Sequence, residues 1–190
     1  MRRLFVPASI VLLSFAGAVP AVAGGNANFV LGPRSVGGHD FWRSEGHQSA
    51  AGVIVDFGKE NWPIHIALAD IDSTSGSDNF HAAVSERALG VMKVWEFQSA
   101  VRPYLGAGVA LVRGSFTTET STGDLVQDDS TVGYYFDGGV FWRTGRRFNI
   151  GFGARLMTGT GLEIQGVDGD ADYHQYHILA GFGWPRREKP

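Results

Sequence analysis

Polarity along this chain alternates with a period of two residues. In residues 148–157, for example, Phe, Ile, Phe, Ala and Leu alternate with Asn, Gly, Gly, Arg and Met. Successive side chains of a β-strand point to opposite faces, whereas a helix would repeat every three to four residues. The alternation therefore predicts an all-β chain. We expect eight strands, at residues 27–34, 49–57, 62–70, 82–97, 102–116, 132–143, 148–158 and 173–184.

The two faces of these strands differ in bulk. In the fifth strand Leu105, Val109 and Leu111 share one face, while Gly106 and Gly108 lie on the other. The small face carries a few ionisable groups but too few Lys, Glu, Thr and Gln to make a good water-soluble exterior. A membrane barrel turns its bulky apolar face to lipid and its small and polar face inward. We therefore predict an eight-stranded antiparallel up-and-down transmembrane β-barrel; a soluble barrel is the alternative.

The links between strands alternate in length. Polar, long links are expected at 70–80, 116–131 and 159–172, and tight ones at 58–61, 98–101 and 144–147. Long loops at one end and short periplasmic turns at the other are typical of outer-membrane barrels. The segment 24–48 admits more than one register for the first strand.

The N-terminus has the pattern of a secretory signal peptide. Arg2 and Arg3 precede an apolar run over 4–19, and Ala21-Val22-Ala23 forms a small-x-small cleavage site. The alternative is a transmembrane anchor, but the run is short for one. We predict a cleaved signal peptide at 1–23, a barrel domain at 24–184 and a short polar tail at 185–190. Cleavage removes two arginines and changes the formal charge from −3 to −5.

Composition excludes several kinds of chemistry. The chain has no Cys, so disulfides and thiol nucleophiles are excluded. Its 27 Gly and 12% aromatic residues suit curved, closely packed strands. The mild charge gives no indication of nucleic-acid binding. The Gly-x-Gly pairs at 106–108 and 151–153 are followed by no helix, so they are not phosphate loops. We expect no cofactor.

Three segments carry a resemblance to a known superfamily: RPYLGAGV at 102–109, NIGFGAR at 149–155 and LAGFGW at 179–184. They resemble strands of the small outer-membrane proteins of the OmpA/OmpX/OmpW-like, porin-like superfamily, and the similarity extends over the mature chain. It implies an integral protein of the Gram-negative outer membrane, monomeric, in contact with outer-membrane lipid and lipopolysaccharide. Members usually end on an aromatic residue read by the barrel-assembly machinery. Here six residues follow Trp184, so either Trp184 is an internal version of that signal or recognition is weaker.

Six ionisable residues are expected to face the lumen: Asp56, His65, Glu86, Asp137, Arg155 and His177. Buried charges must pair, so Arg155 should pair with Glu86 or Asp137. We interpret this set as a structural polar network that plugs a narrow barrel; a conducting or catalytic role is the alternative.

Aromatic residues recur near the strand ends, where they would form girdles at the membrane interface. Ordinary strand-end aromatics are the alternative interpretation. These residues are Trp42, Trp62, Trp95, Trp142, Tyr173 and Trp184.

Acidic residues concentrate at one end. The three long links hold 11 of the 19 acids and no Lys or Arg. The opposite end is basic, with Arg143, Arg146, Arg147, Arg186, Arg187 and Lys189. Such acids would meet lipopolysaccharide through divalent cations or attract basic partners, although solvation of loops is the simpler interpretation.

One acidic loop offers a weak metal candidate. Asp168, Asp170 and Asp172 alternate with small residues and supply the oxygen ligands that calcium prefers. No Glu follows at the distance of a twelve-residue calcium loop.

Candidate nucleophiles and bases lie outside any specific motif. His81 with Ser85 and Glu86, or His174 and His177 with Ser115, are the available sets. Because neither of these two sets follows the His-x-Ser pattern of the lipid A deacylases, we expect no enzyme; a lipid A acyl hydrolase or acyltransferase is the remote alternative. The predicted function is a structural or surface-interaction barrel, with a narrow OmpW-like conduit for small hydrophobic molecules as the second hypothesis.

Overall fold

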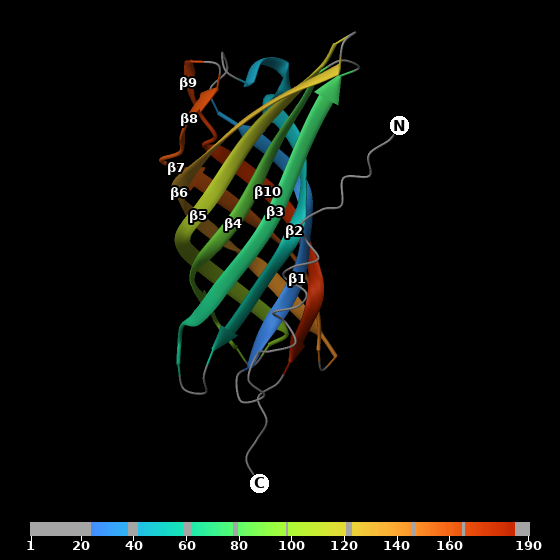
Figure 1. Cartoon of the computed structure of the whole chain (residues 1–190). Coiled ribbons are helices and arrows are strands. Elements are labelled where there is room, and N and C mark those ends of the chain that lie inside the picture. The colour runs from blue at the N-terminus through green and yellow to red at the C-terminus, as the bar shows by residue number, and fades with distance from the viewer. Residues whose placement is uncertain are drawn as a thin grey trace.

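The computed structural model describes residues 24–37, 42–58, 62–77, 80–97, 99–120, 123–145, 147–164 and 166–184. The predicted signal peptide at 1–23 and the tail at 185–190 lie outside the described residues. Eight antiparallel strands close into a barrel (Figure 1). They are β1 (Gly24–Val36), β2 (His47–Gly58), β3 (His65–Ser77), β4 (Phe80–Val94), β5 (Val101–Thr120), β6 (Gly123–Thr144), β7 (Phe148–Thr158) and β10 (Tyr173–Trp184).

Each barrel strand pairs with its neighbours along the chain, and β10 returns to pair with β1, with Leu31 opposite Ile178. This confirms the predicted up-and-down topology. Between β7 and β10 the chain forms a separate hairpin of β8 (Gly161–Ile164) and β9 (Val167–Asp170). A short 3-10 helix, η1 (Arg43–Gly46), precedes β2. No helix in the described part of the chain is long and apolar enough to cross a membrane.

The outer surface of the barrel is apolar and the lumen holds the charges. Along β10 exposed and buried residues alternate, so that Ile178 is 63% exposed and its neighbour Leu179 is 3% exposed. Phe152 on β7 is 56% exposed, whereas Glu86 and Arg155 are almost completely buried. This arrangement is the reverse of a water-soluble barrel. It confirms the predicted assignment of the bulky face to the outside.

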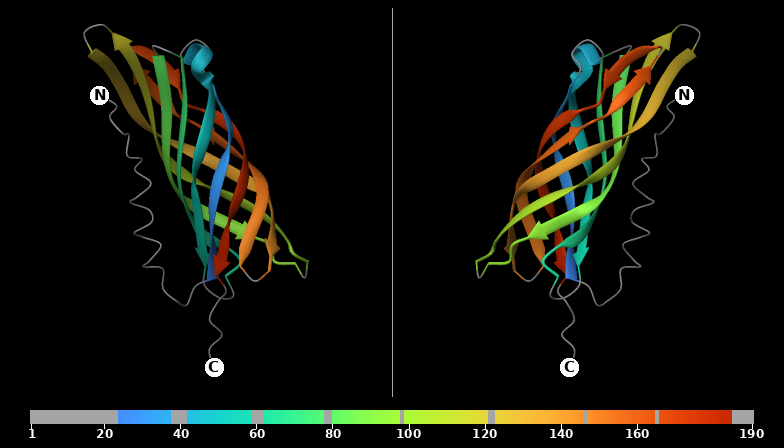
Figure 2. Two further views of the ribbon diagram at one scale, coloured as in Figure 1. Left: turned by 90° about the vertical axis from the view of Figure 1, so that its right-hand side faces the viewer. Right: turned by 90° about the vertical axis from the view of Figure 1, so that its left-hand side faces the viewer.

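Strand occupies most of all three expected long loops, since 159–172 holds the β8–β9 hairpin and the other two extend the barrel strands. β3 continues to Ser77 and β4 begins at Phe80, while β5 continues to Thr120 and β6 begins at Gly123. The prediction of loops at 70–80 and 116–131 was therefore wrong. These segments are rich in Ser and Thr, which suit a strand whose faces are both polar. The ladders continue past the apolar part of the wall, and the barrel is consequently tall at this end (Figure 2).

Inward glycines make room for tyrosine rings. A Cβ atom at Gly90 would collide with the hydroxyl of Tyr135, and one at Gly153 would collide with the hydroxyl of Tyr104. Glycine is favoured where another group approaches the backbone this closely. The small face predicted from the sequence is therefore the surface against which lumenal aromatic rings pack.

Candidate functional site: the lumenal network and the upper cap

A network of four charged side chains crosses the lumen. Arg155 donates from Nη1 to Oδ2 of Asp137 at 3.0 Å and from Nε to Oε1 of Glu86 at 3.0 Å. On the other side Nη2 of Arg34 lies 3.3 Å from Oε2 of Glu86. All four residues are at most 1% exposed. Glu86 is thus held between two arginines from β1 and β7, the two strands that flank β10.

Two residues of β10 complete this network. Tyr173 donates its hydroxyl to Glu86, and the guanidinium of Arg34 stacks 3.9 Å from the centre of the Tyr173 ring. Gln175 accepts from Nε of Arg34 at 2.9 Å and from Nη2 at 2.7 Å. The expected position of Tyr173 at the membrane interface was wrong. Tyr173 is one of the alternate residues of β10 that face the lumen, and its hydroxyl donates to the charged Glu86 there.

Asp56 and His65 belong to a second polar cluster. It lies toward the lower end of the barrel in Figure 1, where β2 ends and β3 begins. Nδ1 of His65 lies 2.6 Å from Oδ2 of Asp56, which also accepts from Asn26 at 3.0 Å. Asn149 donates to Asn26 at 3.1 Å, and Arg143 reaches both asparagines. The six predicted lumenal residues therefore do not form a single network; they divide between two levels.

His177 lies beside the central network without joining its ion pairs closely. Its Nε2 is 3.1 Å from the Tyr104 hydroxyl and 4.0 Å from Oδ1 of Asp137. Its Nδ1 is buried and has no hydrogen-bond partner among the described residues. A buried unpaired nitrogen is costly, and an ordered water is the usual partner at such a position.

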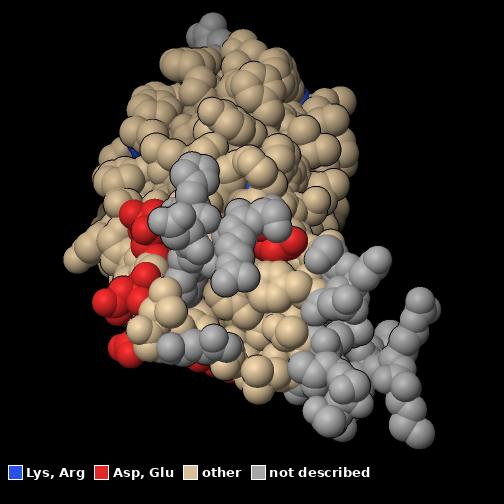
Figure 3. Space-filling model, turned by 90° about the horizontal axis from the view of Figure 1, so that it is seen from above, with Lys and Arg blue, Asp and Glu red and all other residues tan. Residues whose placement is uncertain are grey.

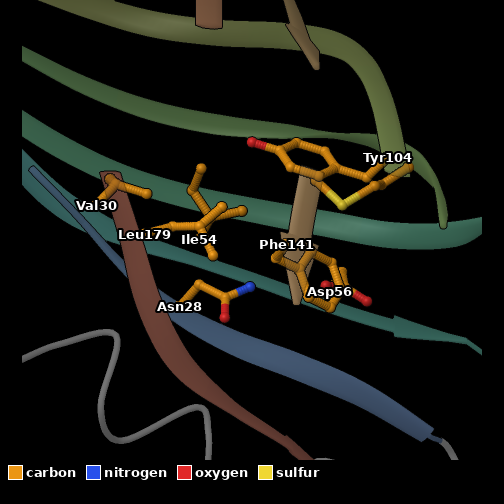
Figure 4. Close-up of a pocket in the computed structure, with 8 residues that line it drawn as sticks. Asn28, Val30, Ile54, Asp56, Tyr104, Phe141 and Leu179 are labelled. Atoms are coloured by element: carbon orange, nitrogen blue, oxygen red, sulfur yellow. The ribbon is translucent and has the colours of Figure 1, made fainter. Parts of the chain in front are cut away.

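A small cavity lies between the two levels (Figure 4). It has room for roughly one water molecule. Its wall is mainly apolar, and its lining residues are Asn28, Val30, Ile54, Asp56, Met92, Tyr104, Phe141 and Leu179. The central network and the Asp56–His65 cluster place polar side chains in the lumen on either side of this cavity.

An apolar cap covers the lumen at the upper end of the barrel in Figure 1, where β3 ends and β4 begins. The Trp42 ring is 1% exposed, lies 4.9 Å from Phe116 and tilts against it, and Phe80 stacks on Phe116 at 5.4 Å. From the β8–β9 hairpin Leu162 enters the same cluster, and Nε1 of Trp42 donates to the carbonyl of Asp170. Trp42 was expected at a membrane interface; it is instead the centre of this cap.

The three aspartates of the acidic loop do not form a metal site. No group of His, Asp and Glu suited to a metal ion occurs among the described residues. Asp172 instead holds the hairpin: its carboxylate accepts from the Thr160 hydroxyl at 2.7 Å, the Thr160 amide at 2.9 Å and the Thr158 hydroxyl at 3.0 Å. Partial burial alone would raise the pKa of Asp172, but these hydrogen bonds outweigh it and hold the pKa below its ordinary value.

Asp172→Asn is expected to loosen the hairpin by about 1 kcal/mol, because the amide accepts fewer of these bonds. The same contacts depend on pH. Since the folded pKa is depressed, their contribution is present above the unfolded pKa of about 4 and is lost as pH falls through the lower, folded value. Amide hydrogen exchange at Thr160 and Ala171 should accelerate in the variant at neutral pH and in the native protein only in acid. Asp168→Asn, an exposed neighbour in the hairpin, is the control; equal protection in both variants would contradict this role.

Acidic residues gather at the upper rim. Seen from above, red carboxylates mark this end of the molecule (Figure 3). Asp129 accepts from the amides of Glu163 and Ser130, which lowers the pKa of Asp129. Two arginines, Arg87 on β4 and Arg113 on β5, lie on the outer wall close to acids, Arg87 opposite Asp70 and Arg113 paired with Asp128.

Four predicted interface aromatics lie at the lower end. Trp62 and Trp95 are in the turns below β3 and β4 and are 63% and 38% exposed, and Trp142 is 39% exposed. Trp184 ends β10 and is partly buried. Their role as a membrane girdle stays a prediction.

The candidate catalytic groups are not brought together. Ser85 faces outward while Glu86, the next residue, lies in the lumen. His174 is exposed and His177 is buried on β10, and β7 and β6 separate that strand from Ser115 on β5.

A closed antiparallel barrel with eight strands, an apolar exterior and a charged lumen is the architecture of small outer-membrane proteins. Solved structures of outer-membrane barrels are similar to this chain over most of its length. Neisserial surface protein A has 14% identity and a TM-score of 0.56, covering 85% of this chain and 95% of that one. Ail of Yersinia pestis has 10% identity and a TM-score of 0.53, covering 85% and 97%.

The N-terminal β-barrel domain of Pseudomonas aeruginosa OprF has 12% identity and a TM-score of 0.50, covering 85% and 99%. No protein-family model and no curated protein matches the chain. At these identities the similarity shows the fold alone: the chain has the fold of small eight-stranded outer-membrane barrels. The neighbours do not single out the OmpW type.

Proposed function

We propose that this chain is an integral protein of the bacterial outer membrane with a structural or surface-interaction role. The observation that carries the proposal is the belt of exposed large apolar side chains on the outside of the barrel, which come from β1, β3, β4, β5, β6, β7 and β10. Phe29, Leu105, Phe136, Phe152 and Ile178 are each more than half exposed. A soluble monomer rarely leaves so continuous an apolar surface to water, and lipid is the solvent that suits it.

The two ends fit this placement. The acidic upper rim faces out of the cell and is suited to basic partners, while the short turns face the periplasm. Export depends on the signal peptide at 1–23, and insertion depends on the barrel-assembly machinery acting on Trp184 as an internal signal. The folded protein is a monomer surrounded by outer-membrane lipid.

Membrane fractionation and heat-modifiable migration in detergent gels test the proposal. We expect the protein in the outer-membrane fraction, with a folded form that migrates differently from the boiled form. A chain that stays soluble and monomeric without detergent would refute it.

The filled lumen favours a structural or surface role over a conduit. Arg34, Arg155 and Glu86 occupy its centre, and the cap around Trp42 covers its upper end. In planar bilayers we expect no reproducible open state. A stable open conductance, absent from vesicle preparations without the protein, would contradict the structural role and favour the conduit.

A further inference from the structure

Five hydrogen-bond donors gather on the outer wall of β4, β5 and β6. Their side chains alternate along the strands with buried or less exposed residues, so they point away from the lumen. We call this set the outer donor patch; it consists of Ser85, Arg87, Arg113, Ser115 and Ser130.

The strand register places the two arginines next to each other. Arg87 lies opposite Leu111, and Arg113 lies opposite Ser85, so the arginines are diagonal neighbours on adjacent strands. Residues that are diagonal neighbours lie about 7–8 Å apart. This is close enough for both guanidinium groups to bind the same anion. Ser130 lies opposite Arg113 on its other side.

The patch stands directly on the apolar belt. Leu89 and Leu111 are the next outward residues below Arg87 and Arg113, and they are 54% and 50% exposed. A ligand held by the arginines would therefore have its apolar part against this belt. A guanidinium binds phosphate through two parallel hydrogen bonds. The hydroxyls of Ser85 and Ser130 beside Arg113, and of Ser115 above it, suit the hydroxyls of a sugar.

Three acids lie beside the patch: Asp128 pairs with Arg113, and Asp70 and Asp72 lie opposite Arg87 and Ser85 on β3. Nη2 of Arg113 lies 2.8 Å from Oδ2 of Asp128, but the Arg113 side chain is 60% exposed. Asp70 lies opposite Arg87, and no ion pair within 4.0 Å joins Arg87 to a described residue. Exposed ion pairs of this kind are worth little, so a multiply charged phosphate competes with them.

We propose that the outer donor patch binds the phosphate group of a phosphorylated glycolipid in the leaflet at the upper end of the barrel. This inference rests on the proposed membrane location and adds a specific lipid contact to it. The arginines hold the phosphate, the serines face the sugar, and the acyl chains lie along Leu89 and Leu111.

The test compares lipids retained by the folded protein in vesicles. Full-length mature chain is refolded into phosphatidylcholine vesicles that contain either diphosphorylated lipid A or the same glycolipid without phosphates. Native mass spectrometry after mild detergent release then measures the bound lipid. We expect retention of the phosphorylated form, and retention about tenfold lower in the double variant Arg87→Ala, Arg113→Ala.

Lys93→Ala is the matched control, because Lys93 lies on the same strand toward the lower end and its loss should leave retention unchanged. Heat-modifiable migration of each variant shows that it has folded. Equal retention by the double variant and the native chain, or equal retention of both glycolipids, overturns the proposal. If free inorganic phosphate competes for the patch as strongly as the glycolipid does, the ligand is free phosphate and not a membrane lipid, and the proposal is overturned. Failure of the native chain to insert into any vesicle would instead overturn the proposed membrane location.

Discussion

Glu86→Ala is expected to lower the free energy of unfolding by about 3–5 kcal/mol. The change removes the acceptor shared by Arg34, Arg155 and Tyr173. Two guanidinium groups would then remain in the lumen with much less compensating charge, and removing one partner of a buried ion pair is far costlier than the net worth of the pair. Urea titration of the refolded barrel in detergent, followed by tryptophan fluorescence, measures the loss.

Two further variants make this result interpretable. Ser85→Ala changes the adjacent residue, which faces outward, and should leave stability within about 0.5 kcal/mol. Glu86→Gln keeps the shape and part of the hydrogen bonding, so its loss should be intermediate. If Glu86→Ala and Ser85→Ala unfold at the same urea concentration, the central network does not stabilise the barrel.

Phe152→Arg is expected to destabilise the barrel in a bilayer by about 2–4 kcal/mol, the cost of an arginine facing lipid near the midplane. Phe152 lies in the middle of the outward apolar column of β7 and is 56% exposed. Phe148→Arg is the matched control at the lower end of the same strand, where the cost falls to about 0–1 kcal/mol.

The comparison separates the two kinds of barrel. Phe148 is 47% exposed, similar to Phe152, so water as the outer solvent would tolerate arginine at both positions or even favour it. Equal stability of the two variants in vesicles would mean that β7 does not cross the bilayer. Urea titration in phospholipid vesicles gives the difference directly.

The period-two pattern was sufficient to predict that eight barrel strands form and which face of each is buried, because the inward face packs in the lumen and the outward face is exposed. The register of β1 was harder. Gly32 and Pro33 interrupt its pattern, so Arg34, the last residue of the predicted strand 27–34, was not assigned to the lumen, yet it is buried and binds Glu86. Tyr173 shares the parity of Gln175 and His177 along β10, and that signal was present in the sequence.

Other features depend on contacts between distant segments. The cap joins Trp42, Phe116 and Leu162, which no local pattern connects. The division of the lumenal polar residues into two levels follows from how far each strand is shifted against the next, and periodicity carries no information about that shift. The Ser- and Thr-rich extensions of β3 and β5 read as loops because their residues are polar on both faces.

The central network also constrains how the chain assembles. Arg34 lies on β1 and Gln175 on β10, 141 residues apart, and the same cluster includes residues of β4, β6 and β7. Contacts of such separation form late, because loop-closure entropy must be overcome first. Until the first and last strands join, Arg34 and Glu86 lack their full set of partners. An unclosed intermediate therefore carries uncompensated charge, and with the proposed membrane location we expect closure of the β1–β10 seam to be a cooperative step that accompanies burial in lipid.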